Sequence, residues 1–297
     1  MHSIGVKTDG SGLRLGLAPE GPIVAALARS ATLTPSMAQQ AAVAETISTA
    51  GVTIPTTVAV TAPPLAMSRE NDFAPWAGGI VVVNKTTGSL FNGERCTGGF
   101  GVRSSTEGRS YLVTASHCGA LNDSFTDGAG ESIGKLTYRH PDHGVALVRA
   151  SSVSGEIYVG GPPGQAQSIR GVARWTAPFK NQMLCQSGAA SGNVCGLRVE
   201  STNEIACMGE PGDAFKCWGP LVLVIRDDGG IAGRLGDSGS PLYYLSGARA
   251  VIVGAVIGGD GGSEMYFVGA NIIDHAFDGV GPYDSKNLEL EPATRSY

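Results

Sequence analysis

The chain has 297 residues, of which 16% are charged and 44 are glycine, with a formal net charge of -5. Low charge with abundant glycine favours an all-β protein over a helical one. The negative balance lacks the basic patch that nucleic-acid binding requires, so we expect no nucleic-acid partner. No apolar run reaches the roughly 18–20 residues of a membrane span, so we expect no membrane span. No signal peptide is visible after Met1, so we expect a longer natural chain or an expressed fragment.

The cysteines are even in number and show no CxxC spacing typical of a zinc site. We therefore expect disulfides, no metal and no cofactor. Pairing in sequence order is the simplest arrangement, although fifteen connectivities are formally possible for six cysteines. Disulfides form in oxidising compartments, which predicts a secreted protein. The six are Cys96, Cys118, Cys185, Cys195, Cys207 and Cys217.

Residues 1–75 carry no cysteine and differ in composition from the rest. Residues 13–17 alternate as a strand does, and residues 56–60 read as a second strand. Between them, Thr-Pro at 34–35 and glycine at 51 bracket an alanine-rich helix pattern. The pattern predicts a small α+β region. The polar stretch at residues 68–72 is a plausible boundary between this region and the remaining chain.

Many short strands at regular spacing follow from residue 76, with almost no helix signal before 271–277. This pattern is typical of a β-barrel or sandwich. We expect a hairpin across Gly108, and a loose tail over residues 281–297. The expected strands are 79–84, 96–102, 111–115, 132–138, 145–150, 168–175, 197–202, 221–225 and 251–257.

Two motifs carry chemistry. In residues 236–241, Gly-Asp-Ser-Gly-Ser-Pro, the glycines let the backbone approach a substrate and aim two N–H groups at one point, as an oxyanion hole requires. The hydroxyl of Ser238 is a weak nucleophile and needs a base. The apolar strand of residues 111–115 leads to His117, and Cys118 directly after it can pin the backbone.

Thr-Ala-Ser-His-Cys at 114–118 and the serine motif at 236–241 together resemble trypsin-like (chymotrypsin-fold) serine proteases, and Cys185 to Gly196 resembles a disulfide loop of their bacterial, streptogrisin-like branch. The resemblance covers roughly residues 76–280. It implies two six-stranded β-barrels with the site in the cleft between them, so the fold class we expect is all-β with a preceding pro-segment-like α+β region. The domains would be 1–75, 76–280 and the tail 281–297.

The resemblance also implies roles for individual residues. His117 and Ser238 would be catalytic, and the backbone N–H groups of Gly236 and Ser238 would form the oxyanion hole. The first two cysteine pairs match bridges of the family. The carboxylate of Asp237 would hold the oxyanion loop, with Arg170 and Arg174 as possible partners. Counting from the motifs places Ala232, Ile257, Gly258 and Gly259 in the substrate-binding wall, with Glu264 as a further candidate near its floor.

The third catalytic residue departs from the family pattern. The family's aspartate opens a strand reading roughly Asp-x-Ala-Leu-Val-Arg, whereas residues 144–149 read Gly-Val-Ala-Leu-Val-Arg. Asp142 lies two residues earlier, and a bend at Gly144 could fold its carboxylate back to His117. Asp142 is therefore the predicted third member, with Asp123 and Asp127 as rivals. The alternative is that no carboxylate is in place.

Residues 209–214 imitate the serine motif, but Ala214 stands where the serine would be and has no hydroxyl. We interpret residues 207–217 as a disulfide-tied hairpin tip. The predicted function is a secreted, monomeric serine endopeptidase with protein or peptide substrates. A catalytically impaired binding module is the alternative, supported by Gly144. An α/β-hydrolase with Ser238 before His275 does not fit, because the motif lacks Gly-x-Ser-x-Gly and strands do not alternate with helices.

Overall fold

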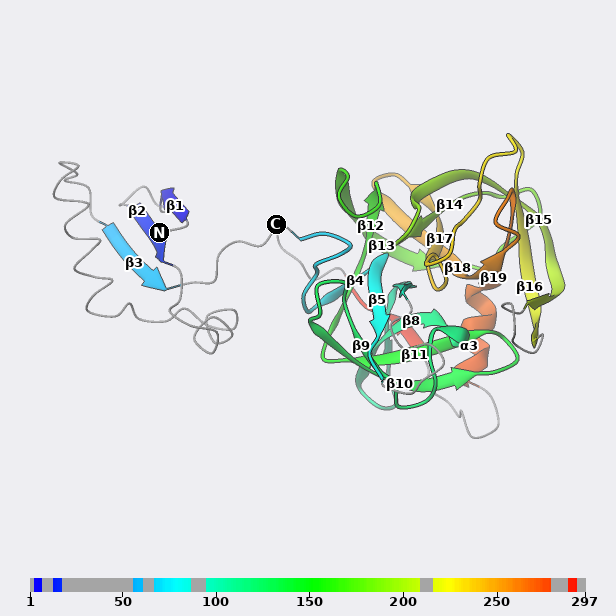
Figure 1. The fold of residues 1–297 in the computed structure, drawn as a ribbon, viewed down its shortest axis with the longest axis horizontal. Helices are drawn as coiled ribbons and strands as arrows, with labels where there is room; N and C mark the ends of the chain where they lie inside the picture. The colour runs from blue at the N-terminus through cyan, green and yellow to red at the C-terminus, as the bar shows by residue number, and fades with distance from the viewer. Residues whose placement is uncertain are drawn as a thin grey trace. The chain divides into compact units, whose positions relative to one another are not determined.

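The computed structural model describes residues 3–6, 13–17, 56–60, 67–86, 95–208, 216–278 and 288–292. The chain forms two compact units, Met1–Ala66 and Met67–Tyr297. Each unit is described by itself below, and Figure 1 labels the strands.

The first unit holds a three-stranded sheet of β1 (Ser3–Val6), β2 (Leu13–Leu17) and β3 (Thr56–Val60). The bounds of β2 and β3 are those predicted from the sequence, whereas β1 was not predicted. β1 and β2 are antiparallel, but β2 and β3 are parallel. A parallel pair needs a long crossover connection. The predicted helix in that connection lies outside the described residues, and a pro-segment role remains a prediction.

The first barrel of the second unit closes through six strand positions. β5 pairs with β6, and β6 continues into β7 after a break at Gly99–Phe100. β7 pairs with β8, then β11, β10 and β9 follow, and β9 pairs back to β5. The strands are β5 (Ile80–Asn84), β6 (Arg95–Gly98), β7 (Gly101–Ser104), β8 (Arg109–Ala115), β9 (Ser124–Thr126), β10 (Ser132–His140) and β11 (Val145–Ala150).

The second barrel also closes through six strands, because β17 pairs with both β14 and β18. From β18 the sheet extends through β13 and β12 to β4. Two six-stranded barrels are therefore confirmed. The strands are β4 (Trp76–Gly78), β12 (Val153–Gly160), β13 (Gln167–Trp175), β14 (Met183–Gly188), β15 (Gly192–Met208), β16 (Lys216–Arg226), β17 (Pro241–Ser246), β18 (Arg249–Gly259) and β19 (Glu264–Gly269).

The barrels are built from nearly continuous apolar runs. All five residues of β5 are buried, as are the first four of β11. The helix predicted at the C-terminal end is α3 (Ala270–Asp278), and its Ile273 and Phe277, one turn apart on one face, are fully buried. The barrel cores fill with aliphatic side chains because alternate strand residues face inward.

The expectation about the C-terminal end of this unit needs correction. Residues 281–297 do not form a loose tail throughout, because β20 (Leu288–Leu290) pairs antiparallel with β7 and Leu288 is buried. The division between the two units, at Ala66–Met67, lies next to the polar stretch at residues 68–72, in which Arg69 and Asp72 are fully buried. A polar run can be internal when distant backbone groups satisfy it.

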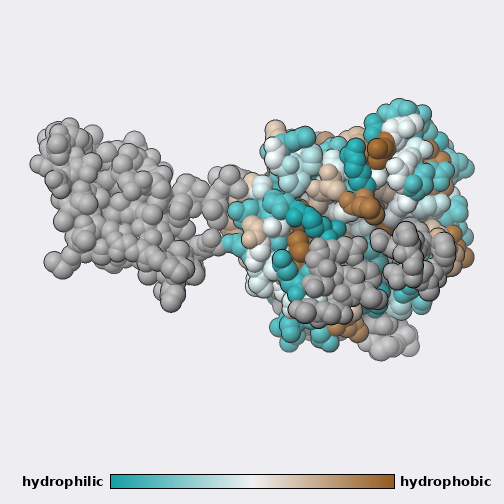
Figure 2. Space-filling model, in the orientation of Figure 1, coloured by the Kyte–Doolittle hydropathy of each residue, from teal (hydrophilic) through white to brown (hydrophobic). Residues whose placement is uncertain are grey.

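The surface in Figure 2 carries its apolar residues as separate spots rather than one broad area on the face shown. Among the residues that the structure describes, no helix has the length and apolar character needed to cross a membrane.

Candidate catalytic site

His117 is carried by a short 3₁₀ turn, η1 (Ser116–Cys118), directly after β8. The Cys96–Cys118 disulfide ties this turn to β6, as predicted, with the Cα atoms 6.2 Å apart. On the other side, the amide of Ser116 donates to the carbonyl of Gly144 at 2.7 Å. The histidine therefore stands on a turn that is fixed to two neighbouring strands of the first barrel.

Ser238 lies in the loop before β17, in the second barrel. Gly236 and Gly239 on either side have φ of +96° and +90°, a region that L side chains rarely adopt. A Cβ on Gly239 would lie 2.2 Å from the carbonyl oxygen of Thr97, so only glycine fits there. The Thr97 amide donates to the carbonyl of Ser238 at 2.8 Å, which links the serine loop to β6 of the first barrel.

The two barrels bring His117 and Ser238 together. The distance between His117 Nε2 and Ser238 Oγ is 2.8 Å, although 121 residues separate them in sequence. This is hydrogen-bond distance for a base and its nucleophile. Desolvation by burial, and secondarily the charge of Arg139, lowers the pKa of His117 to about 4. The imidazole is therefore neutral near pH 7 and able to accept a proton.

The backbone around Ser238 leaves two amides for a ligand. The Asp237 amide donates within the loop to the carbonyl of Arg234 at 3.0 Å. Within the described part of the chain, no acceptor is paired with the amides of Gly236 or Ser238. These are the two amides that the resemblance assigns to an oxyanion hole.

Asp237 holds this loop from behind and is buried. Its carboxylate accepts hydrogen bonds from the amides of Ala190, Ser191 and Arg234 and from the side chain of Gln186, at 2.8–3.2 Å. Arg170 and Arg174 are exposed and are not its partners, so that suggestion from the sequence is wrong. Neutral amide donors take the place of an ion pair. No local sequence pattern predicts these donors for Asp237.

Asp142 is not brought to His117. It is exposed, and its carbonyl accepts a hydrogen bond from the amide of Gly219 at 3.0 Å. In the described residues, Ser238 is the sole hydrogen-bond partner of the His117 ring. The exposed Asp142 carboxylate therefore makes no hydrogen bond to His117 in the described residues, which corrects the predicted third member.

Asp123 and Asp127, the rivals of Asp142, bind other groups. Asp123 accepts from the side chain of Asn84 and from the amide of Ala120. Asp127 accepts from the amides of Asp72 and Glu131, and burial raises its pKa. Both carboxylates close local loops of the first barrel rather than orienting the histidine.

Apolar side chains lie where a side chain at Gly144, the position that matches the family's aspartate, would point. Gly144 has φ of +72°, and a Cβ there would lie 3.1 Å from Ile257 Cδ1 and 3.2 Å from Trp218 Cδ1. Ile257 and Trp218 are 1% and 6% exposed. The ring centroids of His117 and Trp218 lie 6.2 Å apart, with the planes tilted by 52°. We call Ile257 and Trp218 the apolar wall.

Trp218 is supplied by a long hairpin, β15 and β16, that reaches from the second barrel to the first. Its tip carries the Cys207–Cys217 disulfide, and these two cysteines are register partners across the hairpin. The predicted disulfide-tied tip is thus confirmed, as is the Cys185–Cys195 pair. His143 Nδ1 bonds the carbonyl of Gly219 at 2.8 Å, which fixes the hairpin against the first barrel. Ala214 lies outside the described residues.

The four residues predicted for the substrate-binding wall differ in exposure. Ala232 and Ile257 are buried, Gly258 is half-buried and Gly259 is exposed. Behind them, Met265 is 1% exposed and packs in the core cluster that holds Ala232.

Glu264 is half-buried and lies next to Met265 on β19, so the two side chains point to opposite faces. The apolar Met265, and not Glu264, lies toward Ala232.

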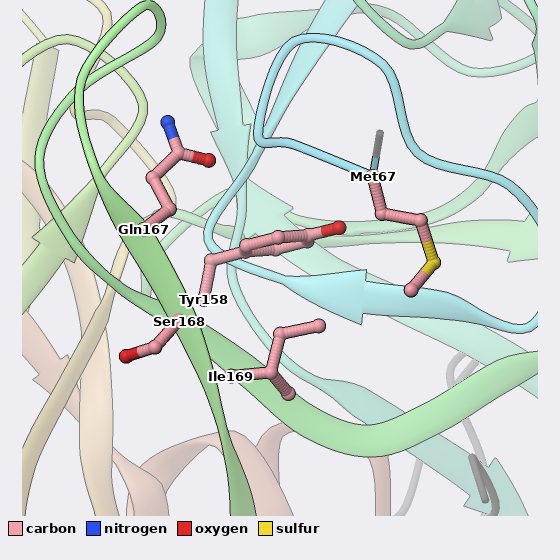
Figure 3. Close-up of a pocket in the computed structure, with 5 residues that line it drawn as sticks. All are labelled: Met67, Tyr158, Gln167, Ser168 and Ile169. Atoms are coloured by element: carbon pink, nitrogen blue, oxygen red, sulfur yellow. The ribbon is translucent and has the colours of Figure 1, made fainter. Parts of the chain in front are cut away.

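A separate pocket of about 350 Å³ is lined by Met67, Tyr158, Gln167, Ser168 and Ile169 (Figure 3). Neither His117 nor Ser238 lines it. Met67, at the start of the second unit, forms one side of it.

Searches against family models and curated proteins found no match to this chain. Solved structures do match. Nocardiopsis protease aligns with a TM-score of 0.52 and 22% identity, over 72% of this chain and 98% of its own. Thermobifida fusca protease A and Cellulomonas bogoriensis chymotrypsin align at 0.53 and 0.52, each 22% identical, over 73% of this chain and 98% of theirs. At this identity the likeness shows the fold, which is that of bacterial chymotrypsin-type proteases.

Proposed function

We propose that this protein is a serine endopeptidase that hydrolyses peptide bonds through an acyl-enzyme. The observation that carries the proposal is the 2.8 Å contact between His117 Nε2 and Ser238 Oγ in a chymotrypsin-type fold. His117 takes the proton of Ser238, whose Oγ attacks the peptide carbonyl. The oxyanion accepts hydrogen bonds from the amides of Gly236 and Ser238. Protonated His117 then gives its proton to the leaving amine, and water hydrolyses the ester by the same steps.

The proposed machinery is a serine–histidine dyad. In a triad, the carboxylate holds the imidazole tautomer and stabilises the imidazolium, and its loss costs about 10⁴-fold in kcat. Here Gly144 holds the matching position, Ile257 and Trp218 lie against it, and the Trp218 ring lies 6.2 Å from the His117 ring. The oxyanion hole and substrate binding alone still accelerate hydrolysis by about 10³–10⁴ over water. We therefore expect slow but measurable turnover.

Labelling with a fluorophosphonate probe tests the proposal. Covalent labelling needs an activated serine and an oxyanion hole, so the oxidised protein should be labelled at Ser238 and Ser238→Ala should not. Ala214→Ser is the matched control for the look-alike motif and should leave labelling and hydrolysis unchanged. No labelling of the wild type, together with reversible peptide binding in the same protein, would favour the binding module instead.

The three disulfides are consistent with an oxidising compartment, and we propose that the protein is secreted. We also propose that it works as a monomer, and that residues 1–66 act as a pro-segment that assists folding. Slow folding of large β topologies gives such an aid a physical reason. Fractionation of a natural host, and sedimentation of the purified protein, would test the first two points.

A further inference from the structure

We propose that Arg69 is a positioning residue for the oxyanion hole, and that residues 67–72, which we call the strap, hold the serine loop from the first residues of the second unit. This inference rests on the proposed function, since it assigns the strap to the same site. Sequence patterns present these residues as a polar boundary, whereas the structure buries Arg69 and Asp72 and leaves the other four half-buried.

Arg69 is fully buried, and each nitrogen of its guanidinium donates a hydrogen bond. Its Nη1 donates to the carbonyl of Gly79 at 2.7 Å, Nε to the carbonyl of Gly161 at 3.0 Å, and Nη2 to Ser187 Oγ at 2.8 Å. The described residues place no carboxylate within ion-pair distance of its guanidinium. Burying a charge without a contacting counter-ion costs several kcal/mol, and burial lowers the pKa of Arg69 to about 10.

One path leads from Arg69 through Ser187 to the serine loop. Just beyond Ser187, at the end of β14, the amides of Ala190 and Ser191 both donate to Asp237 Oδ1, at 3.0 and 2.9 Å. A Cβ on Gly188 would lie 2.1 Å from the same oxygen, so this backbone presses against the carboxylate. Fixing Ser187 therefore fixes Asp237, which lies between the two oxyanion amides.

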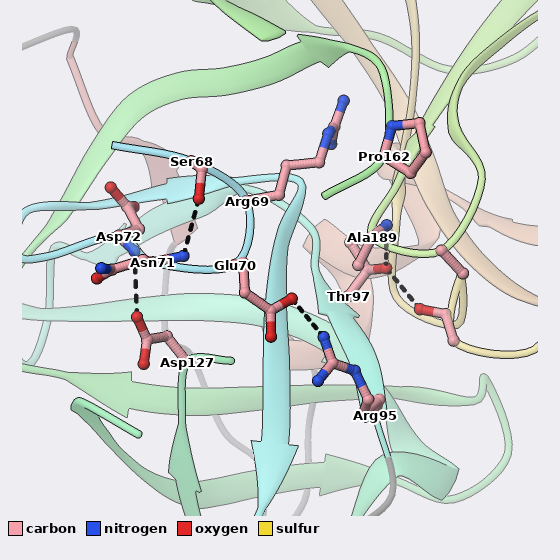
Figure 4. A network of polar contacts seen from close by, with 12 residues as sticks. Ser68, Arg69, Glu70, Asn71, Asp72, Arg95, Thr97, Asp127, Pro162 and Ala189 are labelled. Carbon is pink, nitrogen blue, oxygen red and sulfur yellow. Dashed lines mark hydrogen bonds and ion pairs between the residues drawn. The ribbon is translucent and has the colours of Figure 1, made fainter. Parts of the chain in front are cut away.

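A second path leads from Glu70, the next residue of the strap. Glu70 pairs with Arg95 at the start of β6. Two residues on, Thr97 Oγ1 donates to the carbonyl of Gly236 at 2.8 Å and accepts from the amide of Ala189 at 2.9 Å. Figure 4 shows the strap beside both the Arg95 pair and Thr97. The strap thus reaches the serine loop from two sides.

Charge supports the same assignment. Asp237 is a buried carboxylate held by neutral donors, and Asp237 is among the groups whose charges raise the pKa of Arg69. An ionised carboxylate is the better acceptor for the amides of Ala190 and Ser191. Removing the charge at Arg69 should loosen the loop without touching His117.

The test compares Arg69→Met with Arg174→Met in the full chain. Arg174 is exposed on β13 and lies outside the site, so it controls for loss of one arginine. The readouts are kcat and KM on a peptide substrate, fluorophosphonate labelling rate, and the inhibition constant of a peptide aldehyde, whose adduct places an oxyanion in the hole. Near-UV circular dichroism reports folding.

We expect Arg69→Met to lower kcat and weaken aldehyde binding by roughly 10²-fold, the order of loss when one oxyanion donor is removed, with KM within about threefold. Arg174→Met should match the wild type. A folded Arg69→Met with wild-type kcat and aldehyde affinity overturns the inference. If that variant does not fold, Ser187→Ala removes the acceptor of the Arg69 Nη2 hydrogen bond and leaves the Glu70 path intact. This variant must also bind the aldehyde more weakly. An unlabelled wild type would overturn the proposed function instead.

Discussion

Replacing Gly144 by alanine tests whether the apolar wall leaves any room beside His117. Gly144 has φ of +72°, so any L side chain there is strained, by about 1–2 kcal/mol. The new Cβ would also lie 3.1–3.3 Å from atoms of Ile257 and Trp218. Overpacking of this kind adds about 1–3 kcal/mol. Gly144→Ala should therefore lower the free energy of unfolding by about 2–5 kcal/mol in total.

Gly229 supplies the matched control, because its φ is also +72° and a Cβ added to it would meet nothing within 4 Å. Gly229→Ala should cost only the strain, about 1–2 kcal/mol. The measurement is urea unfolding of the disulfide-intact protein at fixed pH. For a unit of this size, each kcal/mol also corresponds to about 2–4 °C in Tm.

Ile257→Val, made in the wild type and in Gly144→Ala, isolates the contact between the new Cβ and Ile257. This change removes Cδ1, the closest atom to the new Cβ, and should cost about 0.5–1.5 kcal/mol in the wild type. In the Gly144→Ala background it should cost less, because it also relieves the overlap. Equal losses for Gly144→Ala and Gly229→Ala, with additive effects of Ile257→Val, would refute the packed wall.

Four further outcomes are expected. Asp142→Asn should leave kcat/KM within about twofold, because the carboxylate is exposed and not bonded to His117; a fall near 10⁴-fold would restore it as a triad member. Gly144→Asp should lower peptide hydrolysis rather than raise it, since its carboxylate would meet apolar atoms, and a gain in rate would contradict this. At low pH, kcat/KM should fall near pH 4, where His117 becomes protonated. Arg139→Gln should move this fall to higher pH, because the arginine charge lowers the pKa of the histidine. A pH profile that does not move would exclude this coupling. Refolding yield should drop when residues 1–66 are absent, while activity of protein already folded should survive their removal; equal yields would exclude a folding role.

Local patterns were sufficient for much of the fold. β2, β3 and β11 have the bounds that alternation and apolar runs predict. The strands on either side of Gly108 pair as the expected hairpin. Two strands that close the second barrel, β14 and β17, were not predicted. β14 contains Gln186, Ser187 and Gly188, which strand patterns do not favour. Their pairing partners, rather than their own composition, stabilise them.

The sequence by itself predicted which serine and histidine meet, because each sits in a dense local motif. The structure pairs the cysteines in sequence order, the simplest of the connectivities that the sequence left open. Only the tertiary structure decided what surrounds them. Asp142 is two residues from the expected place, yet its direction depends on the bend at Gly144 and on a hairpin tip more than 70 residues away. Arg69 looks like a surface residue, yet carbonyls and a hydroxyl up to 118 residues distant make its burial possible. Polar side chains choose partners over such distances according to which backbone groups the folded barrels leave unpaired, and no short stretch of sequence encodes that choice.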